Sequence, residues 1–122
     1  MAKILYVEDN EDNIYMLKMR LERKGYNVVI SRDGAEGVLK AKTENPDLIL
    51  MDVGLPSMDG YDATKILKNS EETKNIPIII LTAHALVTDV EKAKQAGADE
   101  FETKPINTAS LLAKIEKLIK KI

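Results

Sequence analysis

The chain has 122 residues, with 20 acidic residues, 18 basic residues and no cysteine. This length suits one domain, so we expect residues 1–122 to form a single domain with no output domain. The absence of cysteine excludes disulfides and thiolate metal sites, and the near balance of charge argues against a nucleic-acid partner. No segment resembles a signal peptide or a membrane span, which indicates a cytoplasmic protein without a membrane partner.

Short apolar runs alternate along the chain with segments of helical periodicity. The expected strands, each bounded by turn residues, cover 3–7, 26–31, 48–52, 78–82 and 99–103. The expected helices lie at 14–24, 34–45, 61–69, within 83–96, and from 108 onward. Crossovers of this length imply parallel pairing and right-handed connections. We therefore predict an α/β fold, a doubly wound five-stranded parallel sheet in the order 2-1-3-4-5 with five helices, of the flavodoxin-like kind.

The spacing of apolar residues also predicts which helix faces are buried. In the third helix, Ile66 and Leu67 are expected to face inward. The alanine-rich fourth helix is weakly amphipathic, so we expect it to be the least firmly packed. The last helix carries one apolar stripe, formed by Leu111, Leu112, Ile115, Leu118 and Ile119.

Polar residues stand at the carboxyl ends of four expected strands. These are Glu8 and Asp9, Asp52, Thr82 and Lys104. Parallel strands place these ends at one edge of the sheet, and the first and third strands are neighbours, so three carboxylates share one crevice. Two unit charges about 4 Å apart repel by about 4 kcal/mol at an effective dielectric near 20, so we expect either a cation there or a proton on one of the carboxylates.

The ligand types in this crevice indicate its chemistry. Oxygen ligands without histidine or cysteine suit Mg²⁺, or Mn²⁺, better than zinc. A carboxylate, a divalent cation, a lysine and a hydroxyl are the parts required for phosphoryl transfer to an aspartate. Each residue alone also has an ordinary interpretation, as a turn, strand or surface residue. His84 is a lone histidine that we expect to be exposed in a loop and not a ligand.

Several motifs together resemble the receiver domains of two-component response regulators, and the resemblance covers the whole chain. The motifs are Val7-Glu8-Asp9-Asn10, Leu50-Met51-Asp52, Leu55-Pro56, Met58-Asp59-Gly60, Leu81-Thr82-Ala83 and Lys104-Pro105. Because no output domain follows, the chain is similar to the stand-alone receivers of the CheY- and DivK-like kind. The resemblance implies a signalling phosphoacceptor in a phosphorelay, not an enzyme, although such domains assist their own phosphorylation and dephosphorylation.

The resemblance also implies a role for each matching residue. Asp52 would be the phosphoacceptor. Mg²⁺ would be held by Glu8, Asp9, Asp52 and the backbone carbonyl of Gly54. These positions coincide with the acidic crevice that the strand order predicts.

Further residues would stabilise the phosphoryl group and respond to it. Thr82, Lys104 and the backbone amide of Ala83 would bind the phosphoryl oxygens. Thr82 and Phe101 would move together as a switch, and the peptide bond to Pro105 would be cis.

The resemblance implies partners as well. A histidine kinase or a histidine phosphotransfer protein would supply the phosphoryl group. The surface formed by the fourth helix, fifth strand and fifth helix would then change for a downstream protein target. The protein would be a monomer or a weak dimer.

Two residues depart from the usual receiver pattern. Gly54 stands where many receivers carry a side chain, which leaves the phosphoryl group more open to water and puts its lifetime in doubt. Phe101 replaces the commoner tyrosine, so it can rotate but has no hydroxyl to bond in either position.

Three alternatives remain open at this point. A phosphohydrolase of the haloacid dehalogenase type would also use an aspartyl-phosphate and Mg²⁺, but it needs a second aspartate where this chain has Gly54. A flavodoxin-like nucleotide binder needs a first loop that accepts phosphate, whereas four of the five residues 8–12 are acidic and repel anions unless a cation intervenes. A receiver used only for docking, without phosphorylation, would not require the complete acidic set.

Overall fold

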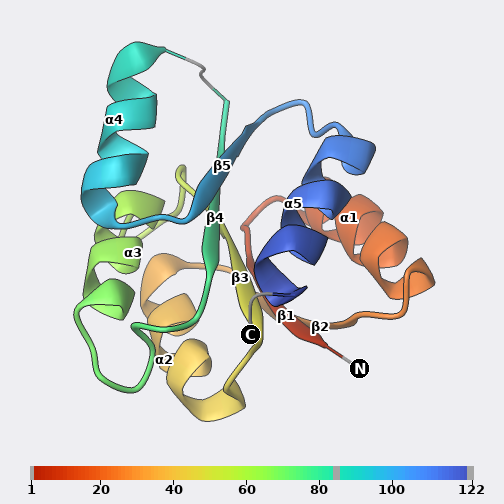
Figure 1. The fold of residues 1–122 in the computed structure, drawn as a ribbon, viewed down its shortest axis with the longest axis horizontal. Coiled ribbons are helices and arrows are strands. Elements are labelled where there is room, and N and C mark those ends of the chain that lie inside the picture. The colour runs from red at the N-terminus through yellow and green to blue at the C-terminus, as the bar shows by residue number, and fades with distance from the viewer. Residues whose placement is uncertain (1, 84–85, 121–122) are drawn as a thin grey trace.

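The computed structural model describes residues 2–83 and 86–120, which form one parallel sheet between two layers of helices (Figure 1). Within these residues, five strands pair in the order β2-β1-β3-β4-β5, all parallel. The strands are β1 (Lys3–Val7), β2 (Asn27–Ser31), β3 (Leu48–Asp52), β4 (Ile78–Thr82) and β5 (Glu100–Thr103). The helices are α1 (Glu11–Arg23), α2 (Gly34–Glu44), α3 (Gly60–Lys68), α4 (Val87–Ala96) and α5 (Thr108–Lys120). The predicted fold and strand order are confirmed.

The two faces of the sheet bury separate apolar clusters. Helices α1 and α5 cover one face, and α2, α3 and α4 cover the other (Figure 1). Strand residues alternate between the faces, so Ile4 and Tyr6 pack toward α1 and α5, while Leu5 and Val7 pack toward the other layer. The central strands are apolar on both faces, which is the pattern of a parallel sheet covered by helices.

Register aligns the carboxyl ends of the strands that carry the predicted site. Val7 of β1 pairs with Met51 of β3, so the next residues, Glu8 just after β1 and Asp52 at the end of β3, lie side by side. On the other side, Thr82 at the end of β4 pairs with Thr103, the residue before Lys104. The predicted site residues are thereby brought to one edge.

The helices end where the sequence predicted breaks. Gly25 and Gly97 have φ values of 93° and 94°, and Asn45 has a φ of 50°, all in the left-handed region that glycine and asparagine tolerate. Asn107 caps α5, because its side-chain oxygen accepts a hydrogen bond from the Ser110 N–H at 3.0 Å.

The predicted burial is right for α5 and partly wrong for α3. In α5, Leu111, Ile115 and Leu118 are buried, and the other two stripe residues pack against the same cluster. In α3, Leu67 is buried but Ile66 is 39% exposed. Consecutive residues of a helix are about 100° apart around its axis, so the two side chains cannot both face the sheet.

His84, expected to be exposed in a loop, lies outside the described residues. Among the described residues, no helix is both long and apolar enough to cross a membrane.

Candidate magnesium and phosphoryl site

Three carboxylates meet at the carboxyl edge of the sheet. Glu8 and Asp9 follow β1, and Asp52 ends the neighbouring β3. One carboxylate oxygen from each lies within 4.8 Å of the others. Glu8 and Asp52 are 2% and 5% exposed, whereas Asp9 is exposed to solvent. The site therefore combines two buried acidic groups with one that faces the entrance.

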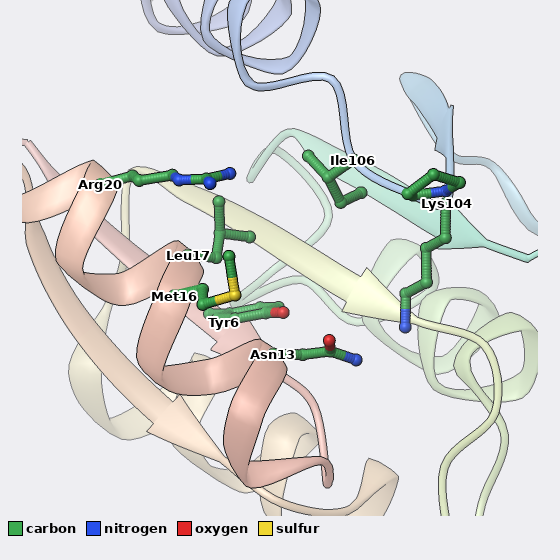
Figure 2. Close-up of a pocket in the computed structure, with 8 residues that line it drawn as sticks. Tyr6, Asn13, Met16, Leu17, Arg20, Lys104 and Ile106 are labelled. Atoms are coloured by element: carbon green, nitrogen blue, oxygen red, sulfur yellow. The ribbon is translucent and has the colours of Figure 1, made fainter.

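Lys104 reaches this cluster from the loop after β5. Its Nζ lies 2.6 Å from Oδ1 of Asp52 and 3.0 Å from Oε1 of Glu8. Figure 2 shows the lysine side chain extending to the end of β3. The backbone N–H of Lys104 donates to the carbonyl of Thr82 at 2.7 Å, which fixes the start of this loop beside β4. The peptide bond between Lys104 and Pro105 is cis.

Burial and charge shift the pKa values of the central pair. Burial raises the pKa of Asp52, and repulsion from Glu8 and Asp9 raises it further, against the opposing effect of Lys104. Burial alone would lower the pKa of Lys104, but its hydrogen bonds to Asp52 and Glu8 outweigh this effect and raise it. The ammonium is therefore held in its charged form, while the ionised carboxylates remain incompletely compensated.

The donor set fits a hard divalent cation. Three carboxylates and one ammonium leave a net negative charge when all are ionised. The ligand atoms are oxygens, the type that Mg²⁺ prefers, and among the described residues no nitrogen or sulfur ligand joins the cluster. Mg²⁺ takes few protein carboxylates and keeps several waters, which agrees with the open side at Asp9.

Two glycines shape the loop after β3. A Cβ at position 54 would lie 3.7 Å from Oδ2 of Asp52, so a side chain at this position would stand over the carboxylate. Gly54 places no side chain over that oxygen. A Cβ at Gly60 would collide with the backbone carbonyl of Asp52, so the close return of the chain at the start of α3 requires glycine.

The predicted switch residues lie on the other side of the site. Thr82 is 3% exposed at the end of β4, and Ala83 after it is exposed. Phe101 pairs in register with Ile80, two residues before Thr82, so Phe101 and Thr82 point toward the same face of the sheet. The Phe101 ring is half-buried, and the Nζ of Lys114 lies 5.6 Å from its centroid.

Sequence reasoning did not assign a role to Tyr6. It treated Tyr6 as one residue of a buried strand, but the hydroxyl lies 3.3 Å from Oε1 of Glu8. The pKa of Tyr6 is raised, first by burial and then by the charge of Glu8. The alternation of side chains along a strand places residues 6 and 8 on one face, so this contact had a signal in the sequence.

A cavity of about 350 Å³ adjoins the acidic cluster, between α1 and the loop after β5 (Figure 2). Its walls are mostly apolar, and Tyr6 and Lys104 belong to both the cavity and the site. The lining residues are Tyr6, Asn13, Met16, Leu17, Arg20, Lys104, Pro105 and Ile106.

Comparison with known proteins agrees with this architecture. The response regulator receiver domain family matches residues 4–116. Protein PilH of Pseudomonas aeruginosa is 38% identical over 119 residues, which cover 98% of both chains. The polar-differentiation response regulator DivK of Brucella ovis is 38% identical over 113 residues, covering 93% of this chain and 92% of DivK.

One solved structure with the same fold contains a metal ion. The receiver domain of the sensor histidine kinase PA1611 from Pseudomonas aeruginosa has a TM-score of 0.91 and 39% identity, with 98% of each chain covered. That crystal structure contains a magnesium ion coordinated in its active-site cleft. The chain belongs to the response regulator receiver family of two-component signalling. Proteins of this class interact with histidine kinases and act as signalling domains rather than as ordinary enzymes.

Proposed function

We propose that residues 1–122 form one receiver domain that accepts a phosphoryl group on Asp52 from a histidine kinase or a histidine phosphotransfer protein. The observation that carries this proposal is the contact of 2.6 Å between Asp52 and Lys104 inside a cluster of three carboxylates. A structural ion pair would not require two further acidic groups, because these raise the cost of ionising Asp52. Three carboxylates around one lysine leave excess negative charge. This arrangement fits a site that binds a cation and then a phosphoryl group.

The chain's own groups divide the work of the transfer. A carboxylate oxygen of Asp52 attacks phosphorus and forms an acyl phosphate, while the bond from phosphorus to the donor histidine nitrogen breaks and the imidazole leaves. Lys104 donates a hydrogen bond to a phosphoryl oxygen as Asp52 loses its negative charge. Glu8, Asp9, Asp52 and the carbonyl of Gly54 would hold Mg²⁺, which when bound neutralises charge on the transferring group.

The response would begin at Thr82 and the amide of Ala83, which would bind the phosphoryl oxygens. Thr82 and Phe101 share one face of the sheet, so a shift of Thr82 would change the space available to the ring. The ring lies against Lys114 of α5, so the change would reach the surface of α4, β5 and α5, where a protein target would bind. Because Gly54 places no side chain over Asp52, we expect water to reach the acyl phosphate more readily than with a larger residue there, and its lifetime to be short.

The test is labelling with a small phosphodonor, such as radiolabelled acetyl phosphate, in the presence of Mg²⁺. We expect label on the wild-type chain while the donor is present and none on Asp52→Asn, because the amide cannot form the acyl phosphate. The matched control is Asp62→Asn, which makes the same chemical change at an exposed residue of α3 and should retain the label.

Unchanged labelling of Asp52→Asn would overturn the assignment of the phosphoacceptor. A wild-type chain that binds Mg²⁺ but takes no label would instead favour a receiver used only for docking. Turnover of free phosphomonoesters would favour the phosphohydrolase alternative.

A further inference from the structure

The carboxylate of Glu8 is held by three donors in the described structure. Its Oε1 contacts the Nζ of Lys104 at 3.0 Å and the hydroxyl of Tyr6 at 3.3 Å. Its Oε2 accepts the backbone N–H of Asn10 at 3.3 Å. Glu8 and Tyr6 are 2% and 1% exposed, so little water competes for these contacts.

Packing alone does not account for the hydroxyl of Tyr6. The ring lies in the apolar cluster beneath α1 and α5, beside Ile4, Leu17 and Leu50. A hydroxyl in such a place costs free energy unless it has a partner, and phenylalanine would fill the same space without that cost. The partner it has is the carboxylate of Glu8. The hydroxyl therefore makes its contact with the acidic site, while the ring packs in the apolar cluster.

We propose that Tyr6 is a positioning residue, whose hydroxyl fixes the orientation of the Glu8 carboxylate for cation binding. This inference rests on the proposed function, because it assigns Glu8 to the magnesium site. A hydrogen bond from outside the ligand set holds a metal-binding side chain in one rotamer before the ion arrives, so less entropy is lost when the ion binds.

Tyr6 can hold Glu8 continuously, whereas Lys104 has more than one partner. Lys104 is shared between Glu8 and Asp52, and in the proposed reaction it also binds a phosphoryl oxygen. The Tyr6 hydroxyl has no such second task among the described contacts, so it can hold Glu8 throughout the cycle. A phenol is protonated at neutral pH, so the Tyr6 hydroxyl can donate to the Glu8 carboxylate.

The geometry also sets the size of the expected effect. A separation of 3.3 Å is long for a hydroxyl donor to a carboxylate, so the bond is a weak one in the absence of the ion. Hydrogen bonds to metal-binding side chains are commonly worth 10- to 100-fold in metal affinity. We therefore expect the loss of the Tyr6 hydroxyl to weaken Mg²⁺ binding by about 10-fold, at the low end of that range.

The experiment compares Tyr6→Phe with the wild-type chain by calorimetric titration with Mg²⁺ alone. We expect the dissociation constant to rise by about 10-fold, while the phosphorylation rate recovers its wild-type value at saturating Mg²⁺. The matched control is Tyr26→Phe, which removes a hydroxyl from another tyrosine packed against the same cluster and should leave the affinity unchanged. Urea unfolding without Mg²⁺ reports whether either variant alters folding.

The outcomes separate this inference from the proposed function. If Tyr6→Phe binds Mg²⁺ as tightly as the wild type, the positioning role is wrong, whatever the labelling shows. An equal loss of affinity in Tyr26→Phe would also overturn it, because a general effect of removing a hydroxyl would then explain the result. If the wild-type chain binds Mg²⁺ and Tyr6→Phe weakens it, but no label appears on Asp52, the positioning role stands and the proposed function fails.

Discussion

The middle of the sheet buries apolar side chains. A few residues further along the same strands, the carboxyl edge of the sheet buries charged ones. In β3, the four residues from Leu48 to Met51 are fully buried, and the next residue, Asp52, is a carboxylate that is 5% exposed. Burying an aliphatic side chain contributes about 1.5–3 kcal/mol to the free energy of unfolding. Burying a charge costs free energy unless it is well paired.

The comparison shows that the apolar middle of the sheet stabilises the fold, whereas the charged carboxyl edge lowers its stability. Two helices on opposite faces of the sheet also differ, since α5 buries large side chains such as Ile115, while α4 buries only Ala93 and Ala96. At the start of α4, the large apolar side chains of Leu86 and Val87 are 65% and 73% exposed. Burial of the apolar middle therefore offsets the free-energy cost of the buried charges at the carboxyl edge. A ligand that neutralises these charges should raise the free energy of unfolding.

The largest effect should come from the apolar middle. Ile115→Ala removes a fully buried side chain of α5, and the cavity it leaves should lower the free energy of unfolding by about 2–5 kcal/mol. Urea denaturation measures the change. The matched control is Leu39→Ala in α2, which truncates a side chain that is 62% exposed and should change the value by about 0.5 kcal/mol or less. Equal losses in both variants would contradict the contrast between core and surface.

The next effect should come from the cation at the carboxyl edge. Mg²⁺ at about 100 times its dissociation constant should raise the free energy of unfolding by about 2.7 kcal/mol relative to protein in EDTA. Sodium chloride at the same ionic strength separates binding from screening. Asp62→Asn should retain the stabilisation, because residue 62 is outside the acidic cluster. If Mg²⁺ stabilises no more than sodium does, the acidic cluster is not a cation site.

A smaller effect of opposite sign should follow from removing the central charge. In EDTA at neutral pH, Asp52→Asn should raise the free energy of unfolding by about 1 kcal/mol, the usual size of a single-residue effect. The reason is the raised pKa of Asp52, caused first by its burial, which means that the folded state disfavours the ionised carboxylate.

The pH dependence of this difference has a definite sign. Above the pKa of Asp52 in the folded state, the carboxylate is ionised in both states and the full penalty is present. As the pH falls through that pKa, the folded wild type takes up a proton and the penalty is relieved, and it is gone below the ordinary value of 3.8. The advantage of Asp52→Asn in urea unfolding should therefore shrink with falling pH. An advantage that grew toward acid would contradict the assigned cause.

Local pattern in the sequence was sufficient to predict the elements and the edge they share. Apolar runs and turn residues located each strand to within about a residue, and glycines marked the ends of α1 and α4. The sequence also predicted that the polar residues at the strand ends meet, because parallel pairing places every carboxyl end at the same edge of the sheet. The sequence did not show which of Ile66 and Leu67 is buried, because two adjacent apolar residues fit the helical period almost equally well.

Only the tertiary structure decided which side chains touch. Lys104 and Glu8 are far apart in the chain, and their contact at 3.0 Å depends on the register of β1, β3, β4 and β5 together. The contact between Tyr6 and Glu8 and the cavity beside it depend likewise on how α1 and the loop after β5 pack. Periodicity records the environment of each residue along its own strand or helix, whereas a contact between elements is fixed by the packing of the whole sheet.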